Sequence, residues 1–270
     1  MSSTAAGKAG HRHAHVAPSA PRLLHITDTH LHAAHDTRLR GVDTFLTLSR
    51  VLDRARCDPR PAQAVLATGD LSQDETPASY AAFRDLLAPL DIPVWCLPGN
   101  HDEPRAMRAA LTEPQFRVGG AHLTGNWCVI LLDSYLAGDH GGRLAPAHLQ
   151  WLDATLQAAT APHVLVAIHH HPLPLGSGWL DELGLYNADA LLEVLDCCPR
   201  LRAVVAGHVH QASDLSRNGV RYLTTPSTCF QFLPESDVFA VDRRPPGFRW
   251  LDLQSDGSID TEVVWTETAR

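Results

Sequence analysis

The sequence predicts an α/β protein with two facing mixed β-sheets flanked by helices. Three observations support this fold class. Short apolar segments typical of buried strands alternate with amphipathic segments over much of the chain. Polar clusters rich in Asp, Asn and His follow five of these apolar segments, as expected where active loops lie at strand ends. After Gly219 the pattern changes to strands alone, which indicates that the strands divide between two sheets.

The first part of the chain alternates strands with helices. A helix is expected after Gly41, because apolar residues such as Phe45 and Leu48 keep helical spacing. Pro77 is well placed near the start of a second helix. Residues 146–159 form a third, with leucines at helical intervals. Strands are expected at residues 23–26, 64–67, 92–97, 129–132, 164–168 and 203–206.

The two ends of the chain have a different character. Residues 1–20 are rich in Ala, Gly, Ser and His without apolar periodicity, so we expect a disordered tail followed by one domain over residues 21–270. Asp256-Gly257 is a strong signal for a hairpin turn near the end of the chain. The late strands are expected at residues 220–223, 238–241, 248–253 and 259–265.

Composition narrows the class of protein. At 270 residues, with 44% hydrophobic and 19% charged residues, the chain can bury a substantial core. A net charge of −8 argues against broad nucleic-acid binding and against stable membrane association. The six cysteines form no CxxC pair, so we expect reduced thiols and a cytoplasmic location. Neither a membrane span nor a secretory signal is evident, and composition leaves the oligomeric state open.

The polar clusters contain residues that bind metal ions. Asp28 and His30 are two residues apart, so in an extended chain their side chains point to the same side. The same spacing relates His208 and His210. Asp70, after Gly69, is the natural bridging carboxylate, because it has two oxygens for two ions. Each cluster alone is weak evidence, and their combination predicts a metal site.

Two further clusters complete the set. The amide oxygen of Asn100 can serve as a neutral ligand, whereas the adjacent His101 is expected to project elsewhere and act as a proton donor. Asp102 is expected to cap a helix rather than to act in catalysis. His169 is preferred as a ligand because it comes first after an apolar strand; the two histidines after it stay as alternatives.

These ligands are too many for a single ion. Two metal ions bridged by one carboxylate are the economical arrangement, and this arrangement hydrolyses phosphate esters. A purely structural zinc site is disfavoured, since such sites are usually closed and cysteine-rich. The predicted metal ligands are Asp28, His30, Asp70, Asn100, His169, His208 and His210.

The clusters resemble, in order, the five signature blocks of the calcineurin-like metallophosphoesterases. The flanking residues are most similar to the class III 3′,5′-cyclic AMP phosphodiesterases of bacteria, from about residue 22 to residue 264. The resemblance implies a four-layer sandwich of two mixed sheets between helices. The matching blocks are Asp28-x-His30, Gly69-Asp70, Gly99-Asn100-His101-Asp102, the run from His169, and Gly207-His208-x-His210.

The resemblance also implies how the ligands divide. Iron and manganese are the expected pair of ions, with zinc, cobalt or magnesium as alternatives. The first ion, often iron, would be held by Asp28, His30, Asp70 and His210, and the second, often manganese, by Asp70, Asn100, His169 and His208.

The resemblance implies hydrolysis of 3′,5′-cyclic AMP to 5′-AMP by a metal-bridging hydroxide, with His101 as an imidazolium assisting the leaving oxygen. Trp179 and Phe230 are candidates either for stacking on adenine or for apolar lid packing. The alternative function is hydrolysis of other phosphate esters, such as 2′,3′-cyclic nucleotides, glycerophosphodiesters or a lipid-linked pyrophosphate. A non-catalytic scaffold is disfavoured because all the ligands are present. Substrate contacts are expected from His30, Asp70, Asn100, His101 and His210.

Overall fold

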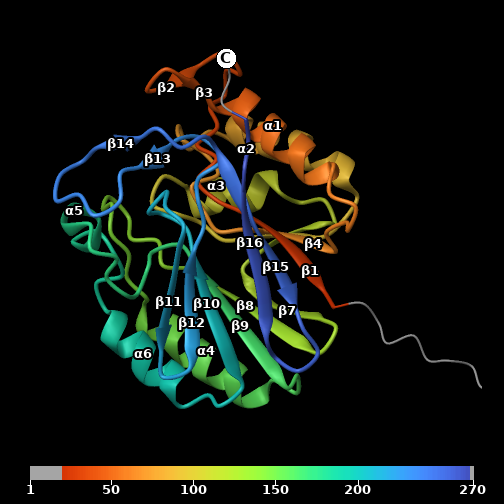
Figure 1. The fold of residues 1–270 in the computed structure, drawn as a ribbon, viewed down its shortest axis with the longest axis vertical. Coiled ribbons are helices and arrows are strands. Elements are labelled where there is room, and N and C mark those ends of the chain that lie inside the picture. Colours follow the sequence, from red (N-terminus) through yellow and green to blue (C-terminus); the bar gives the residue numbers. More distant parts are fainter. Residues whose placement is uncertain (1–19, 268–270) are drawn as a thin grey trace, which may run out of the picture.

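The structure is a computed structural model that describes residues 20–267. Within these residues two mixed sheets of six strands face each other, with helices on their outer sides (Figure 1). This arrangement confirms the predicted α/β class with facing sheets. Residues 1–19 of the predicted N-terminal tail lie outside the described part of the chain.

The first sheet combines strands from both ends of the domain. Its four strands from the first half of the chain run parallel, and two strands from the C-terminal end extend it antiparallel. The order across the sheet is β16 (Ile259–Trp265), β15 (Gly247–Leu253), β1 (Arg22–Ile26), β4 (Ala64–Ala67), β5 (Val94–Cys96) and β6 (Phe116–Val118).

The second sheet is built from the middle of the chain. Four parallel strands form its centre, and an antiparallel strand closes each edge. The order is β11 (Ser213–Arg217), β12 (Val220–Thr224), β10 (Leu201–Ala206), β9 (His163–Ile168), β8 (Trp127–Leu132) and β7 (Gly120–Thr124).

Helices cover the outer face of each sheet. Each of the three predicted helices is present, and the first is capped by Asp43, whose side chain accepts a hydrogen bond from the amide of Leu46. In the described part of the chain, no helix is both long and apolar enough to cross a membrane. The helices are α1 (Thr44–Arg56), α2 (Pro77–Leu87), η1 (Ala88–Leu90), α3 (Pro104–Ala110), α4 (Pro146–Ala158), α5 (Gly178–Asp181) and α6 (Ala188–Asp196).

The core has three layers because the central strands are buried on both faces. Along β8, Trp127 and Val129 face the opposite sheet, whereas Cys128 and Ile130 face the helices α4 and α6. The same alternation places Leu23 of β1 between the sheets, and Leu24 and Ile26 against α1 and α2. Continuous apolar segments in the sequence therefore correspond to strands that pack on two sides.

One predicted strand is wrong. Only Val241 of the segment 238–241 is in a strand, the short β14 (Val241–Asp242), which pairs with β13 (Gln231–Phe232). Val238 is 69% exposed and Phe239 41%, so these apolar residues do not enter the core. The predicted hairpin at Asp256-Gly257 is confirmed between β15 and β16, where Gly257 has a φ of +91°.

A buried histidine joins the two sheets. The Nε2 atom of His25, on the inner face of β1, lies 2.9 Å from Thr68 Oγ1, and its Nδ1 lies 2.7 Å from Thr225 Oγ1 beyond β12. Burial, together with the positive charge of Arg249, lowers the pKa of His25 to about 3. His25 is therefore neutral in the folded protein at any pH near neutrality.

This depressed pKa makes folding stability depend on pH. Below the ordinary histidine pKa of about 6.5, the unfolded chain binds a proton that folded His25 does not, so stability falls as pH falls. Between about pH 7 and pH 5 the wild type is expected to lose roughly 2 kcal/mol more than a His25→Gln variant. Urea unfolding at both pH values measures this difference, and equal pH dependence in the two proteins would disprove it.

Candidate metal centre

Five strand ends bring the predicted ligands together. The parallel strands β1, β4 and β5 of the first sheet end beside β9 and β10 of the second. Because the carboxyl ends of parallel strands meet at one edge of a sheet, the loops that follow them meet there too. The seven predicted ligands, Asp28, His30, Asp70, Asn100, His169, His208 and His210, all lie in these loops and converge on one region.

The local backbone differs from the extended chain that the spacing suggested. Asp28 and His30 have φ values of +54° and +46°, and Asp70, His208 and His210 are also left-handed. Non-glycine residues rarely adopt this conformation, and those that do are found most often at functional sites. Asp28 and His30 converge as predicted, through left-handed turns rather than the alternation of a strand, whereas His208 and His210 lie in different groups of candidate ligands.

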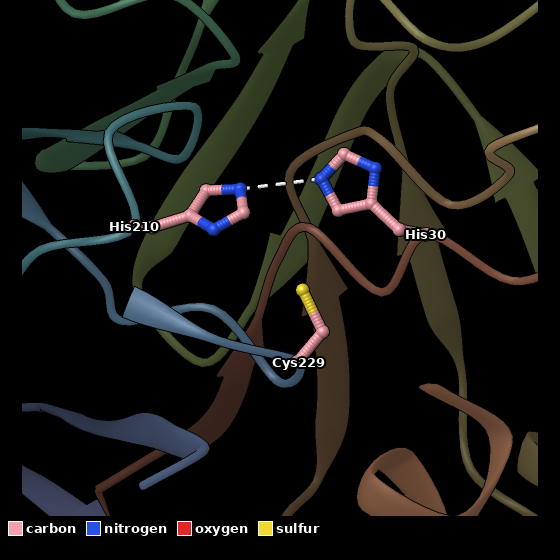
Figure 2. Close-up of side chains that lie close together, drawn as sticks. All are labelled: His30, His210 and Cys229. Carbon is pink, nitrogen blue, oxygen red and sulfur yellow. Dashed lines mark hydrogen bonds between the residues drawn. The ribbon is translucent and has the colours of Figure 1, made fainter. Parts of the chain in front are cut away.

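Four of the candidate ligands form a first group on one side of the centre. His30 Nε2 lies 3.2 Å from His210 Nε2 (Figure 2), and the latter lies 3.3 Å from Asp28 Oδ1. His30 Nε2 is also 3.9 Å from Asp28 Oδ1 and 3.7 Å from Asp70 Oδ2. Two imidazole nitrogens and two carboxylate oxygens therefore surround one point.

A second group lies beside the first. Asn100 Oδ1 is 3.1 Å from His169 Nε2 and 3.0 Å from His208 Nδ1. His169 Nε2 is also 3.5 Å from Asp70 Oδ2. The same carboxylate oxygen of Asp70 thus faces one histidine of each group, which is the position that a bridging ligand requires.

Asp70 is held in this position by its neighbours. Its Oδ1 atom accepts a 2.8 Å hydrogen bond from the backbone amide of His101, which leaves Oδ2 toward the two groups. Gly69 before it has a φ of +95°, and a Cβ there would lie 2.6 Å from both Gly99 N and His169 Nδ1. Only glycine lets these loops approach so closely.

Backbone carbonyls fix which imidazole nitrogen faces the centre. His169 Nδ1 donates to Thr68 O at 2.7 Å, and His210 Nδ1 donates to Phe230 O at 2.7 Å. In the neutral tautomer, each Nε2 atom then presents its lone pair to the centre. A carbonyl that orients a histidine in this way is the usual outer partner of a metal ligand.

The electrostatics of the centre are those of a buried anionic site. Burial would raise the pKa of Asp70, but the charge and hydrogen bond of His169 hold it well below its usual range. Burial would lower the histidine pKa values, yet the neighbouring carboxylates raise those of His169 and His210 to about 9 and 10. The ionised carboxylates therefore require positive charge beside them.

The donor set fits metal ions. Asp28 Oδ1 is fully buried and, within the described residues, has no hydrogen-bond partner. A carboxylate oxygen in that state is costly unless a cation faces it. Mixed oxygen and imidazole nitrogen donors suit divalent ions such as manganese, iron and zinc. Both groups can therefore hold an ion with Asp70 between them.

The prediction for Asp102 is wrong. Glu103, not Asp102, caps α3 and accepts from the amides of Arg105 and Ala106. Asp102 is fully buried, and its carboxylate instead accepts three backbone amides, from Gly99 at 2.9 Å, Ser72 at 3.0 Å and Leu71 at 3.2 Å. It therefore ties the loops after β4 and β5 together beneath the ligands.

The structure distinguishes the three consecutive histidines. His169 joins the second ligand group, as predicted. His170 Nδ1 lies 2.8 Å from Ser134 Oγ, and its Nε2 lies 3.2 Å from His140 O. His171 Nε2 lies 3.4 Å from Asp181 Oδ1. The two later histidines thus have partners in the surrounding loops, and the ring of His170 also lies 4.7 Å from that of His208.

A cavity of about 320 Å³ opens over the centre, a size suited to a small organic ligand. His101 lines it, and the ring centroid of His101 lies 5.1 Å from that of His30. Opposite the metal-binding residues the lining is mainly apolar and aromatic. This part consists of Leu39, Arg40, Trp179, Leu180, Leu183, Phe230, Phe232 and Phe239.

Several of these cavity residues were missed by the sequence analysis. His140, which the sequence analysis did not single out, lines the cavity with its ring centroid 5.7 Å from that of His101. Arg40 packs its guanidinium 4.2 Å from the ring of Phe239, and Gln73 lies 3.3 Å from His101 Nδ1. No motif marks these positions, although Gln73 lies in the same loop as Asp70.

Comparison with known proteins identifies close relatives over most of the chain. A 3′,5′-cyclic adenosine monophosphate phosphodiesterase CpdA from Pseudomonas aeruginosa is 43% identical, over 89% of this chain and 88% of the relative. The protein of the same name from Escherichia coli K12 is 42% identical, over 90% and 88%. A 3′,5′-cyclic-nucleotide phosphodiesterase from Nostoc is 38% identical, over 89% and 91%.

Solved structures share the fold at low sequence identity. A dimetal phosphatase from Danio rerio superposes with a TM-score of 0.67 at 16% identity, covering 92% of this chain and 100% of that one. The protein TT1561 of Thermus thermophilus has a TM-score of 0.61 at 14% identity, covering 90% and 99%. The fold is that of the metallophosphoesterases. The family model described as calcineurin-like phosphoesterase matches residues 21–212, and the chain belongs to this family, which confirms the resemblance seen in the sequence.

Proposed function

We propose that this protein is a metal-dependent phosphodiesterase that hydrolyses 3′,5′-cyclic AMP to 5′-AMP. The observation that carries the proposal is the position of Asp70 Oδ2, 3.7 Å from His30 Nε2 and 3.5 Å from His169 Nε2, beneath the cavity. The relatives named as cyclic nucleotide phosphodiesterases, at 38 to 43% identity, support the choice of substrate.

The two ligand groups would hold two metal ions, iron with manganese as the preferred pair. When bound, such ions lower the pKa of water to supply a nucleophile near neutral pH and neutralise charge on phosphoryl oxygens. Zinc, cobalt and magnesium are alternatives that the donor set also accommodates. The proposed ligands are Asp28, His30, Asp70 and His210 for one ion, and Asp70, Asn100, His169 and His208 for the other.

His101 is the proposed proton donor. The Gln73 side-chain amide faces His101 Nδ1 at 3.3 Å, which leaves Nε2 as the nitrogen available to the substrate. His101 would hold a proton at Nε2 and pass it to the ribose 3′ oxygen as the bond from phosphorus to that oxygen breaks. The phosphate would lie against His30, Asp70, Asn100, His101 and His210.

An aromatic wall is placed to receive the base. Trp179 of α5 packs edge to face on Phe232 and Phe239, at centroid distances of 5.0 and 5.3 Å. Phe232 also stacks on the proposed ligand His210 at 4.2 Å. A nucleotide whose phosphate lies over the ligands would place its base near this wall, where stacking on an aromatic ring stabilises it.

Replacing Trp179 by leucine is expected to raise the KM for cyclic AMP by about tenfold or more, since stacking of a base on an aromatic side chain is worth roughly 1–3 kcal/mol. The KM for bis(p-nitrophenyl) phosphate, which has no nucleobase, should change much less. Trp151→Leu is the matched control, because Trp151 is 39% exposed on α4 and does not line the cavity. An equal rise in KM for both substrates would contradict a role in base binding.

The function itself is tested by comparing substrates. Protein stripped of metal and reloaded with manganese or iron should release 5′-AMP from 3′,5′-cyclic AMP faster than it hydrolyses 2′,3′-cyclic AMP or linear diesters. Faster turnover of a linear diester or a phosphomonoester would be consistent with the proposed metal centre but would refute cyclic AMP as the preferred substrate. No metal-dependent turnover of any of these esters would overturn the proposal as a whole.

We further propose that the protein works in the cytoplasm. All six cysteines are free thiols, and reduced thiols are usual in that compartment. Labelling of intact cells with a membrane-impermeant thiol reagent tests this: the exposed Cys57 and Cys197 should react only after lysis.

A further inference from the structure

A buried thiol lies beside the first ligand group. Cys229 follows β12 and is only 1% exposed. Its sulfur, a nitrogen of His30 and a nitrogen of His210 all lie within 4.8 Å of one another. Figure 2 shows the sulfur directed toward the space between the two imidazoles. The seven ligands predicted from the sequence do not include this residue.

The hydrogen bonds around Cys229 fix the direction of its sulfur. Ser227 Oγ donates to Asp28 O at 2.8 Å and accepts from the backbone amide of Cys229 at 2.9 Å. Because that hydroxyl proton is already used, the contact of 3.0 Å between Ser227 Oγ and Cys229 Sγ has the thiol as donor. The sulfur therefore accepts no hydrogen bond from Ser227.

A second observation points to a cation at the same place. Asp28 Oδ1 is fully buried, lies 3.3 Å from His210 Nε2, and has no hydrogen-bond partner among the described residues. Its nearest imidazole belongs to His210, one of the two histidines that Cys229 also approaches. Ser227 also links the two residues, because it bonds the backbone of Asp28 and the amide of Cys229.

We propose that Cys229 is a further ligand of the first metal position. This inference rests on the proposed metal centre and adds a sulfur donor to two imidazoles and two carboxylates. On binding, the thiol loses its proton to solvent and the sulfur forms a bond to the ion. A thiolate is a soft ligand, so it biases this position toward zinc, cobalt or ferrous iron and against magnesium.

X-ray absorption at the zinc edge tests the proposal directly. Protein loaded with two equivalents of zinc and dialysed should show a sulfur neighbour at about 2.3 Å, the usual length of a bond from zinc to thiolate. Because the spectrum averages over both zinc ions, the fitted signal should correspond to one sulfur neighbour for every two ions. A spectrum that contains only oxygen and nitrogen neighbours overturns the proposal.

Variants identify which sulfur is seen. Cys229→Ser should lose the sulfur neighbour, whereas Cys128→Ser, at a buried thiol on β8 away from the centre, should keep it. A Cys57→Ser/Cys197→Ser double variant removes two exposed thiols and should also keep it, without any change at Cys229. Loss of the signal in this double variant would assign the sulfur to the surface and overturn the proposal.

The outcomes separate this inference from the proposed function. Two retained zinc ions with no sulfur neighbour refute the role of Cys229 and leave the metal centre intact. Failure of the wild type to retain zinc refutes both. A sulfur neighbour in the wild type that disappears in Cys229→Ser supports both.

Discussion

Asp70→Ala is expected to empty both metal positions and to abolish hydrolysis of cyclic AMP. The Oδ2 atom of Asp70 faces His30 and His169, one histidine of each group, so its removal takes a ligand from both ions. Loss of an outer-shell partner alone typically weakens metal binding by roughly 10- to 100-fold, and loss of a bridging ligand should exceed this.

Elemental analysis after metal loading and dialysis measures the first effect, and release of 5′-AMP measures the second. Asp85→Ala is the matched control, because this carboxylate on α2 is 68% exposed and pairs only with Arg84 among the described residues. Asp70→Asn should also lose metal and turnover, since it keeps the shape of the side chain but removes its negative charge. Two bound ions and near-normal turnover in Asp70→Ala would refute the bridging role.

His101→Ala is expected to keep both metal ions and to lower kcat for cyclic AMP by about 10²- to 10⁴-fold, the usual contribution of a general acid. The variant preserves the backbone amide that donates to Asp70 Oδ1, so the bridging carboxylate stays oriented. The imidazole at the cavity is lost, and with it the proton for the departing 3′ oxygen.

The leaving group distinguishes proton donation from a structural role. A p-nitrophenyl diester releases a weakly basic oxygen that needs little protonation, so His101→Ala should lose much less activity on it than on cyclic AMP. His148→Ala, at a histidine of α4 that does not line the cavity, should leave both activities unchanged. Equal losses on the two substrates, or loss of metal, would contradict the assignment of His101.

The convergence of the candidate ligands could be predicted from the sequence because each follows a buried strand. A parallel strand that ends in a polar cluster specifies both the edge of the sheet and the side chains there. The same rule favours His169 over His170, because His169 Nε2 lies beside Asn100 and Asp70 whereas His170 Nδ1 lies beside Ser134. The division into two facing sheets followed from the change of pattern after Gly219.

The details of the loops could not be predicted in the same way. The left-handed conformations of Asp28 and His30 depend on packing between loops of both sheets, which no local pattern records. Asp102 looked like a helix cap because it precedes α3 closely, yet two of its three partners, Leu71 and Ser72, lie some thirty residues away. Long-range hydrogen bonds of this kind override local propensity.

The cavity wall was beyond sequence reasoning for a related reason. Phe239 belongs to a segment that resembled a strand, because apolar residues at a binding site and in a core look alike in sequence. Arg40 and His140 lie on loops without a motif and reach the cavity only through the tertiary fold. Cys229 looked like an ordinary buried thiol, and only its distance from His30 and His210 distinguishes it.

Two ions acting together across Asp70 are the central feature of the proposed mechanism. Stripped protein should therefore be titrated with manganese while bound metal and release of 5′-AMP from cyclic AMP are measured on the same samples. The proposed centre predicts two bound ions per chain, with turnover that appears only as the second position fills. Full turnover with a single bound ion, or turnover in stripped protein, would contradict this mechanism.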